Sequence, residues 1–352
     1  MKLVLISDLH FGIHNDSEIF LEHQRNFFEE QFFPYIISQK IKNIIILGDM
    51  FDRRKYTNHQ TIHFLKNNFF DALKRMDITV HSIMGNHDVA LKSTNSINSP
   101  NLLLREYENV IYYSHPNHIT FDSLKILMMP WINPENQTEL YEVMNKSSAP
   151  IMLGHFELKD EELRRNFKFA NGVLSKEVSR FEKVISGHYH HKFTKGNFTY
   201  LGTPYQLDNS DIDSEKGFHI LDTETRSLTF IKNLKTLFEL IVWDDHLTEK
   251  EIDNLDPNFF TRKYIKIKVK KKNKINLFEK FFTTIENFNP YDISLDETEA
   301  VLDDKVEIKH TDDTLSVFKK HINAISEFDE KKKRLVYSTI DETYHEAFKY
   351  IF

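Results

Sequence analysis

The sequence predicts an α/β protein whose N-terminal two-thirds alternate short buried strands with longer amphipathic helices. Five apolar runs rich in Ile, Val and Leu are each followed directly by a polar motif. Runs of this length are typical of buried strands. Segments with a helical spacing of apolar residues, such as Ile19–Ile37 and Thr61–Met76, lie between them. Strands that alternate with helices indicate an α/β core, in which ligands bind beyond the carboxyl ends of the strands.

Each predicted strand ends at carboxylate, amide or imidazole side chains. In chain order the pairs of run and motif are Lys2–Ile6 with Asp8 and His10, Ile44–Leu47 with Asp49, Ile78–Met84 with Asn86, His87 and Asp88, Ile151–Leu153 with His155, and Val184–Ile185 with His188 and His190. One such dipeptide would mean little, and a single histidine is more often a packing or surface residue. Five motifs in order, each after an apolar run, indicate one shared site.

A different pattern begins near residue 235. Arg262–Lys274 alternates apolar residues with lysines, which predicts a strand with one basic face. Ile275–Ile285 has helical spacing, and Tyr291–Leu295 is a further strand candidate. We therefore expect a small α+β domain over residues 235–300, after a first domain over residues 1–234.

An acidic stretch, Asp296–Asp304, precedes the C-terminal segment. We expect a linker at residues 301–311 and two helices within residues 312–352. Leu315, Phe318 and Ile322 fall at the spacing of a helix seam, which suits a partner helix. The alternative is an amphipathic helix pair that packs on its own domain.

Composition excludes several classes of protein. The 352 residues carry 46 Lys and Arg against 53 Asp and Glu, a net charge of −7, so any contact with nucleic acid must come from local basic patches. The absence of Cys excludes disulfides and thiolate metal sites and fits a reducing cytoplasm. No apolar run reaches the length of about 18 residues that a membrane-spanning helix needs. The first run meets Asp8 and His10 before a signal-peptide core could be completed.

The side chains at the strand ends form a ligand set without sulfur. Eight candidates, namely Asp8, His10, Asp49, Asn86, His87, His155, His188 and His190, exceed what one ion needs. Carboxylate, imidazole and amide ligands suit Mn²⁺, Fe²⁺ or Zn²⁺. Two adjacent metals, one carboxylate bridging them, are the arrangement that hydrolyses phosphate esters. His191 adjoins His190 and stays an alternative to it, although the two-residue spacing from His188 favours His190.

These motifs resemble the calcineurin-like metallophosphoesterases, and within them the SbcD/Mre-eleven type of DNA repair and recombination nuclease subunit. The resemblance covers about residues 1–225. The branch is favoured by four further segments, Asp49–Arg53, Met129–Trp131, Gly154–Leu158 and Tyr200–Tyr205. It implies a β-sandwich flanked by helices, followed by a capping domain and a helical tail.

The resemblance also implies roles for individual residues. Asp8, His10 and His190 would hold one metal, Asn86, His155 and His188 the other, and Asp49 would bridge them. Mn²⁺ is the ion we expect first, with Mg²⁺, Fe²⁺ and Zn²⁺ as alternatives. His87 would act on the leaving group, with Asp88 orienting it. Some relatives carry His at the position of Asp52, so the catalytic part of Asp52 stays open.

Partners follow from the same resemblance. We expect DNA contacts at Arg53, Arg54 and Lys55 beside the site, and at Lys268 and Lys270 on the basic strand, whose alternative is a solvated sheet face. The residues 312–352 would bind an SMC-like coiled-coil ATPase of SbcC type, and two chains would pair in a 2:2 complex. The expected setting is the cytoplasm of a bacterium or a phage-infected cell, with no membrane contact.

The expected activity is that of a DNA nuclease, a 3′→5′ exonuclease on duplex ends and an endonuclease on single strands and hairpins. One alternative is a stand-alone phosphomonoesterase or cyclic-nucleotide phosphodiesterase, which would not need residues 235–352. The other is a DNA-end or scaffold protein without catalysis, which a missing ligand would favour. All the ligand positions are filled in this sequence.

Overall fold

The computed structural model describes residues 1–159, 161–163, 168–298, 322–323 and 329–349. The chain divides into two units, the first formed by Met1–Glu239 with Arg262–Tyr264 and the second by Leu240–Thr261 with Ile265–Phe352. Within the described ranges, no helix combines the length and the apolar character needed to cross a bilayer.

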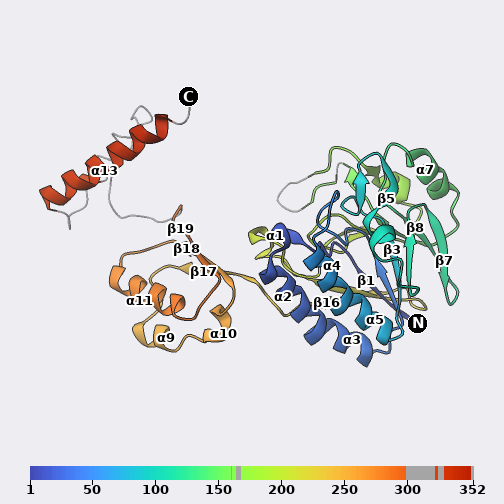
Figure 1. Cartoon of the computed structure of the whole chain (residues 1–352), viewed down its shortest axis with the longest axis horizontal. Coiled ribbons are helices and arrows are strands. Elements are labelled where there is room, and N and C mark those ends of the chain that lie inside the picture. Colours follow the sequence, from blue (N-terminus) through green and yellow to red (C-terminus); the bar gives the residue numbers. More distant parts are fainter. Residues whose placement is uncertain (160, 164–167, 299–321, 324–328, 350–352) are drawn as a thin grey trace. The chain divides into compact units, whose positions relative to one another are not determined.

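Two six-stranded sheets build the first unit (Figure 1). The first has the order β16–β15–β1–β2–β3–β6. Its strands β1, β2, β3 and β6 are parallel, whereas β15 and β16 are antiparallel to their neighbours. The bounds are β1 (Lys2–Ile6), β2 (Asn43–Ile46), β3 (Thr79–Ile83), β6 (Val110–Tyr113), β15 (Gly217–Asp222) and β16 (Leu228–Lys232).

The second sheet has the order β13–β14–β12–β9–β8–β7. Its four central strands are parallel and its two edge strands are antiparallel. The bounds are β7 (Asn117–Phe121), β8 (Leu124–Met129), β9 (Ile151–His155), β12 (Lys183–Gly187), β13 (Phe193–Lys195) and β14 (Phe198–Tyr200). Two short pairs lie in the connections, β4 (Val89–Leu91) with β5 (Thr94–Asn98), and β10 (Leu158–Lys159) with β11 (Val173–Leu174).

The two long predicted helices are confirmed, each with a π-helical turn inside it. The turn at Phe28–Phe32 joins α2 to α3, and the turn at Lys66–Phe70 joins α4 to α5. The helices of this unit are α1 (Ile13–Asp16), α2 (Glu18–Phe27), α3 (Phe33–Ser38), α4 (His59–Leu65), α5 (Asp71–Arg75), α6 (Ser99–Leu103), α7 (Gln137–Lys146) and α8 (Ser175–Val178).

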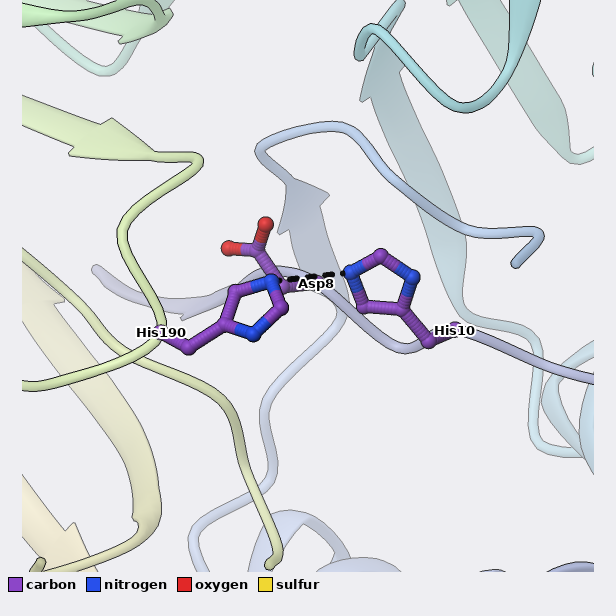
Figure 2. A group of neighbouring side chains, drawn as sticks. All are labelled: Asp8, His10 and His190. Atoms are coloured by element: carbon purple, nitrogen blue, oxygen red, sulfur yellow. Dashed lines mark hydrogen bonds between the residues drawn. The ribbon is translucent and has the colours of Figure 1, made fainter. Parts of the chain in front are cut away.

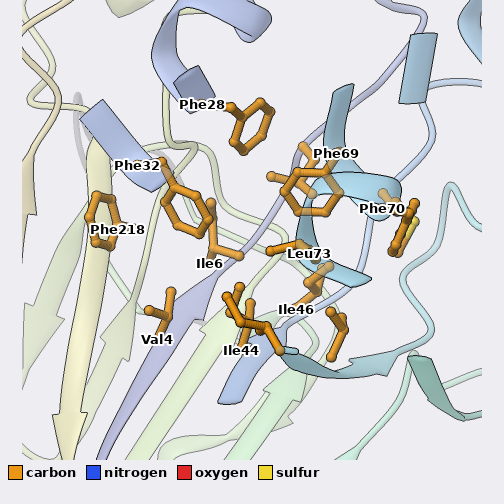
Figure 3. Packing of buried hydrophobic residues seen from close by; sticks show 14 of the residues in the cluster. Val4, Ile6, Phe28, Phe32, Ile44, Ile46, Phe69, Phe70, Leu73 and Phe218 are labelled. Atoms are coloured by element: carbon orange, nitrogen blue, oxygen red, sulfur yellow. The ribbon is translucent and has the colours of Figure 1, made fainter. Parts of the chain in front are cut away.

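Alternation along the strands distributes side chains between separate apolar layers. On β1, Leu3 and Leu5 lie in a cluster shared with strands of the second sheet, which places this cluster between the sheets. Val4 and Ile6 lie in another cluster with the phenylalanines of the helices (Figure 3). Because both faces of the parallel strands are buried, the sequence shows continuous apolar runs there. The predicted sandwich with flanking helices is confirmed.

The second unit has a three-stranded sheet of order β17–β18–β19. On β18, Ile265, Ile267 and Val269 are buried, and Lys266 and Lys268 occupy the other face, as the alternation predicts. The buried strand residues pack with Trp243 in one apolar cluster. The elements are β17 (Phe238–Trp243), α9 (Glu249–Asp253), α10 (Pro257–Phe260), β18 (Tyr264–Val269), α11 (Ile275–Glu286), β19 (Asp292–Asp296) and α13 (Glu330–Lys349).

The C-terminal predictions are tested only in part. The second predicted tail helix is confirmed as α13. The linker, together with Leu315 and Phe318 of the predicted partner seam, lies outside the described residues. Ile322, the third seam residue, is described and is buried.

Buried neutral histidines make the fold sensitive to acid. His219 on β15 is 3% exposed, and burial, with Lys192 as a smaller cause, lowers its pKa to about 3. In the unfolded chain the pKa of this histidine would be about 6.5. Between pH 7 and pH 5 the unfolded state therefore binds a proton at His219 that the folded state does not bind. We expect the free energy of unfolding to fall by about 2 kcal/mol over this range through His219 alone.

The replacement His219→Leu should remove that share of the pH dependence. The measurement is urea unfolding with a chelator present at pH 7 and pH 5. The control is His59→Leu, because the side chain of His59 is exposed. Equal pH slopes for wild type and His219→Leu would contradict the prediction.

Candidate metal centre

The polar motifs meet at the carboxyl ends of strands from both sheets. Parallel pairing of β1 with β2 and β2 with β3, and of β9 with β12, brings these ends side by side. In the first sheet Asp8 and His10 follow β1, Asp49 follows β2, and Asn86 and His87 follow β3, whereas in the second sheet His155 ends β9 and His188 and His190 follow β12.

Glycines let the two sets of strand ends approach closely. A Cβ atom on Gly187 would lie 2.0 Å from Ser7 Oγ, and a Cβ atom on Gly85 would lie 2.2 Å from the backbone nitrogen of Asp49. No other residue fits at such distances. Glycine is therefore required at these two positions because a side chain would not fit, in addition to the backbone flexibility that a turn after a strand needs.

Asp8, His10 and His190 form the first group of side chains that could hold a metal ion (Figure 2). Their ligand atoms all lie within 4.8 Å of one another, and the Nε2 atoms of the two histidines are 3.1 Å apart. Asp8 and His10 are buried, and the Asp8 carboxylate also accepts two hydrogen bonds of 3.1 Å from the backbone N–H of His188. Burial, with smaller effects of His10 and Lys216, lowers the pKa of His190 and so favours the neutral ring that binds metals.

Asp49, His155 and His188 form the second group, and Asn86 joins them. His155 Nε2 lies 3.3 Å from Asp49 Oδ2 and 2.9 Å from Asn86 Oδ1. His188 Nδ1 lies 2.8 Å from the same amide oxygen. Asp49 Oδ2 is also 3.9 Å from His10 Nε2 of the first group. Asp49 is therefore the residue that borders both groups.

Hydrogen bonds fix which ring nitrogens carry protons, and they leave lone pairs facing inward. His155 Nδ1 lies 2.6 Å from the carbonyl oxygen of Leu47, which can only accept a hydrogen bond. In the neutral ring Nδ1 therefore carries the proton, and Nε2 is unprotonated with a lone pair. His188 Nε2 lies 3.3 Å from a Glu157 oxygen, which favours a proton there and a bare Nδ1. Two imidazole lone pairs and the Asp49 carboxylate thus converge on the Asn86 amide. A divalent cation fits this donor set.

The site attracts positive charge even without a metal. Burial alone would lower the pKa of His155, but the charge and hydrogen bond of Asp49 raise it to about 9. Burial would raise the pKa of Asp49, but the charges of His155 and His10 hold it well below its usual range. Buried carboxylates are normally paired or bound to metals, so the negative field of this pocket suits cations.

The backbone is strained where it presents these ligands. Asp8, His10, Asp49 and His188 have positive φ angles of 55°, 45°, 52° and 83°. Residues other than Gly rarely adopt this region, and such strain collects at functional sites. The hydrogen bond of 3.1 Å from the Asp8 N–H to the Gly48 carbonyl, and that of 3.1 Å from His10 N–H to the Asp49 carbonyl, hold the two loops together.

Glu157 belongs to the site although no sequence pattern assigns it a role. It lies two positions after His155, and its carboxylate holds the far nitrogen of the His188 ring. A carboxylate behind a ligating histidine fixes the ring orientation and makes it a stronger ligand. The only available signal was its place in the segment Gly154–Leu158.

His87 and Asp52 form a third group of candidate ligands with His10, which also belongs to the first group. His87 Nδ1 donates a 2.5 Å hydrogen bond to the backbone oxygen of Asp52, which leaves Nε2 for other contacts. The Asp52 carboxylate lies 3.4 Å from His10 Nδ1, so its side chain faces a ligand and its carbonyl orients His87. The rings of His10 and His87 pack edge to face at 4.9 Å.

Asp88 does not occupy the position expected for it. We predicted that it orients His87, but its described hydrogen bonds come from the backbone N–H groups of Gly85, Met50 and Phe51, at 2.9, 2.9 and 3.2 Å. Burial and the charge of Asp49 raise its pKa to about 7. Asp88 thus ties the loop after β2 to the loop after β3, and the Asp52 carbonyl holds His87 instead.

The structure places His190 and His191 in different surroundings. His190 belongs to the first ligand group, whereas His191 Nδ1 lies 3.0 Å from Ser214 Oγ. The backbone oxygen of His190 accepts a 2.7 Å hydrogen bond from Lys216 Nζ. Lys216 is itself buried and paired at 2.5 Å with Asp211. This buried ion pair therefore supports the backbone that carries His190.

We expect Lys216→Met to weaken metal binding and to destabilise the fold by about 3–5 kcal/mol, because Asp211 would stay buried without its partner. The double variant Lys216→Met/Asp211→Asn should recover much of the stability. It should still bind Mn²⁺ about 10- to 100-fold more weakly than wild type, the usual effect of losing a residue that supports a ligand. Calorimetric titration with Mn²⁺ measures this, and wild-type affinity in the double variant would show that His190 does not depend on the pair.

The basic residues predicted to contact DNA have different surroundings. Arg53 donates to Asp16 and Asn15 at 2.9 and 2.7 Å, so it holds the turn α1. Arg54 Nη1 is buried and has no partner among the described residues. Lys55 is exposed. In the second unit Lys268 is partly exposed and Lys270 is exposed.

Comparison with known proteins defines the class of protein. The model of the calcineurin-like phosphoesterase family matches residues 1–192, more than half of the chain, so the chain belongs to this family. It is a metal-dependent phosphoesterase, and its clustered His and Asp side chains suit the divalent metals that the family uses.

Individual relatives narrow the placement. The chain is 28% identical over 353 residues to "Exonuclease subunit 1" of Enterobacteria phage T4, with 99% of each chain covered. It is 23% identical over 346 residues to the SbcD subunit of the nuclease SbcCD from Staphylococcus epidermidis, covering 86% of this chain and 92% of that one. It is 24% identical over 248 residues to "DNA double-strand break repair protein Mre11" of Nanoarchaeum equitans, covering 62% and 66%. The predicted likeness to nuclease subunits of this branch is confirmed.

Proposed function

We propose that this chain is the nuclease subunit of a DNA end-processing complex. The observation that carries the proposal is the position of Asp49, which belongs to one group of candidate metal ligands and borders another. Similarity to nuclease subunits along the whole chain supports DNA as the substrate.

The residues divide into two ligand sets in this proposal. Asp8, His10 and His190 would hold one divalent ion, Asn86, His155 and His188 would hold the other, and Asp49 would contribute to both. Two such ions, when bound, activate the attacking water and stabilise the charge that develops on the phosphate. Mn²⁺ is the ion we propose, on the basis of the mixed imidazole and carboxylate ligands.

The remaining polar residues act on the substrate. His87 protonates or stabilises the leaving oxygen through Nε2, since its Nδ1 is already bonded to the Asp52 carbonyl. The hydrogen-bond partner of Arg54 depends on the orientation of the Asn86 amide. When the amide nitrogen faces His155 and His188, the amide oxygen accepts a 3.1 Å hydrogen bond from Arg54 Nη2. With the oxygen inward, as a metal requires, Arg54 loses that acceptor and is available to a phosphate. Lys55 supplies a further charge nearby, whereas Arg53 is committed to Asp16.

The substrates we propose are duplex ends, degraded 3′→5′, and single strands and hairpins, cut internally. The test is degradation of labelled duplex, hairpin and single-stranded DNA in Mn²⁺, with p-nitrophenyl phosphate and a cyclic nucleotide in parallel. Cleavage of DNA at a far higher kcat/KM supports the proposal. Preference for either small ester would favour a phosphomonoesterase or cyclic-nucleotide phosphodiesterase instead, and no hydrolysis at all would favour a scaffold protein.

The regions beyond the phosphoesterase domain are proposed to serve binding. We propose that residues 235–300 form a capping domain that contacts DNA through Lys268 and Lys270. We propose that residues 312–352 bind the coiled coil of an SMC-like ATPase. Removing residues 312–352 should leave a metal-loaded protein that cuts short DNA and no longer co-purifies with the ATPase. Precipitation of the shortened chain would show that the segment belongs to its own core.

We also propose that two chains pair within a 2:2 complex. Apolar side chains are exposed on successive elements: Leu91 and Ile97 on the β4–β5 pair are each 50% exposed, and Leu102 on α6, which follows β5 directly, is 57% exposed. Exposed apolar groups that lie near one another often mark protein contacts. Light scattering should give the mass of a dimer for the wild type and of a monomer for Ile97→Asp/Leu102→Asp.

A further inference from the structure

A pocket of about 620 Å³ adjoins the second ligand group of the metal centre. Two of the residues that line it also contact His188: the Trp131 ring lies 5.3 Å from the His188 ring, and a Glu157 oxygen lies 3.3 Å from His188 Nε2. Its volume falls in the range of about 300–1,000 Å³ typical of pockets for small organic groups. A group held there would lie beside the reacting phosphate.

Hydrogen bonds fix the backbone of Trp131. Its N–H donates to the Met84 carbonyl at 2.8 Å, and its own carbonyl accepts from the side-chain amides of Asn95 and Asn136 at 3.1 and 2.9 Å. The indole itself is only partly buried and makes no hydrogen bond through Nε1 among the described residues. By contrast, the chain's other tryptophan, Trp243, is fully buried in a core. A partly exposed indole that lines a pocket from a fixed backbone is suited to stacking.

The chemistry of the lining fits a flat, neutral, hydrogen-bonding group. Tyr141 and Phe156 add aromatic surface, and Gln137 and Asn171 add amides that can donate and accept. The lining contains one lysine, Lys159, which is fewer cations than a second phosphate would need. Stacking on aromatic rings with amide contacts at the edge is how proteins hold unpaired nucleobases.

We propose that this Trp131 pocket binds the nucleobase next to the scissile phosphate, with the base stacked on the indole. This inference rests on the proposed nuclease function and specifies its substrate: the nucleotide at the cut must be unpaired, so the enzyme acts on a strand that is single or has been opened at its end. Base pairing hides the face and edge that the pocket would contact.

The test combines variants of the protein with variants of the substrate. Oligonucleotides carry a normal base or an abasic sugar on either side of the cleaved bond, and kcat/KM is measured in Mn²⁺. The wild type should prefer the substrate with a base, on one side, by about 10- to 100-fold. In Trp131→Ala this ratio should fall close to one, whereas Trp131→Phe should retain part of it. The control Phe230→Ala removes a partly buried aromatic residue of β16 that does not line the pocket.

A ratio that survives in Trp131→Ala, or a wild type that is indifferent to the base, would overturn the inference while leaving the nuclease function intact. Equal losses on both substrates would show that Trp131 merely supports His188. Binding without cleavage provides an independent measurement: 2-aminopurine deoxynucleoside monophosphate, added with Ca²⁺, should be quenched by the wild type and bound at least about tenfold more weakly by Trp131→Ala. If DNA is not cleaved at all, the proposed function fails, and this binding result alone decides whether the pocket takes a base.

Discussion

Asp49→Asn is expected to abolish hydrolysis of every phosphoester and to reduce the number of Mn²⁺ ions bound per chain from two to one or none. Asp49 Oδ2 lies 3.3 Å from His155 Nε2 and 3.9 Å from His10 Nε2, so one carboxylate borders both ligand groups. The amide has nearly the same shape but carries no charge. Losing the charge that holds two cations together should slow hydrolysis by about 10³-fold or more.

Metal analysis after equilibrium dialysis and hydrolysis of bis-p-nitrophenyl phosphate measure the two effects separately. The matched control is Asp71→Asn, because Asp71 accepts a hydrogen bond of 2.8 Å from the Tyr107 hydroxyl and belongs to none of the ligand groups. The control should retain two ions and full activity. Two ions in Asp49→Asn would disprove the bridging role, whatever the loss of rate.

The gathering of the ligands could be predicted because two local patterns and one topological rule suffice for it. Buried strands appear as apolar runs, and polar residues that follow parallel strands share an edge of the sheet. Asp8 and His155 are far apart in the sequence and yet belong to adjacent ligand groups for this reason. The pairing of two sheets was predictable only from the family resemblance, since the runs themselves do not say which strands share a sheet.

Side-chain partners that depend on the packing of separate loops could not be predicted. Asp88 was expected to orient His87, as carboxylates behind functional histidines often do. Its carboxylate instead accepts from the N–H groups of Met50 and Phe51 in another loop. The role of Lys216 could not be predicted either, because a lysine in a sequence usually indicates a surface residue. Only the structure shows its contacts with Asp211 and with the backbone carbonyl of His190.

Arg53 has a structural role that the sequence did not reveal. A run of three basic residues after Asp49 predicted substrate contacts for all of them. The structure uses Arg53 to hold α1, where His14, Asn15 and Asp16 all have positive φ angles. A left-handed backbone conformation costs about 1–2 kcal/mol of conformational energy per residue. The hydrogen bonds that Arg53 makes to this turn therefore help to stabilise it. The number of charges in a segment does not show whether an arginine bonds within the protein, as Arg53 does, or is available to the substrate, as we propose for Arg54.

His87→Asn is expected to leave both metals bound and to lower the rate of DNA cleavage by about 10²–10⁴-fold, the usual contribution of a proton-transfer group. The backbone N–H of His87 donates to Asp49 Oδ1 at 2.7 Å, and its ring is fixed by the Asp52 carbonyl, so only Nε2 is left to reach a leaving oxygen. Asparagine keeps the backbone contact and removes the ring. Metal stoichiometry should therefore be unchanged, in contrast to Asp49→Asn.

The leaving group distinguishes proton donation from simple support of the site. The alkoxide released from DNA needs a proton, whereas p-nitrophenolate leaves readily without one, so the loss in His87→Asn should be much smaller on bis-p-nitrophenyl phosphate than on DNA. His191→Asn is the matched control, since His191 Nδ1 is bonded to Ser214 and lies in none of the ligand groups. Loss of a metal in His87→Asn, or equal losses on both substrates, would identify His87 as a ligand or a structural support and not as the proton donor.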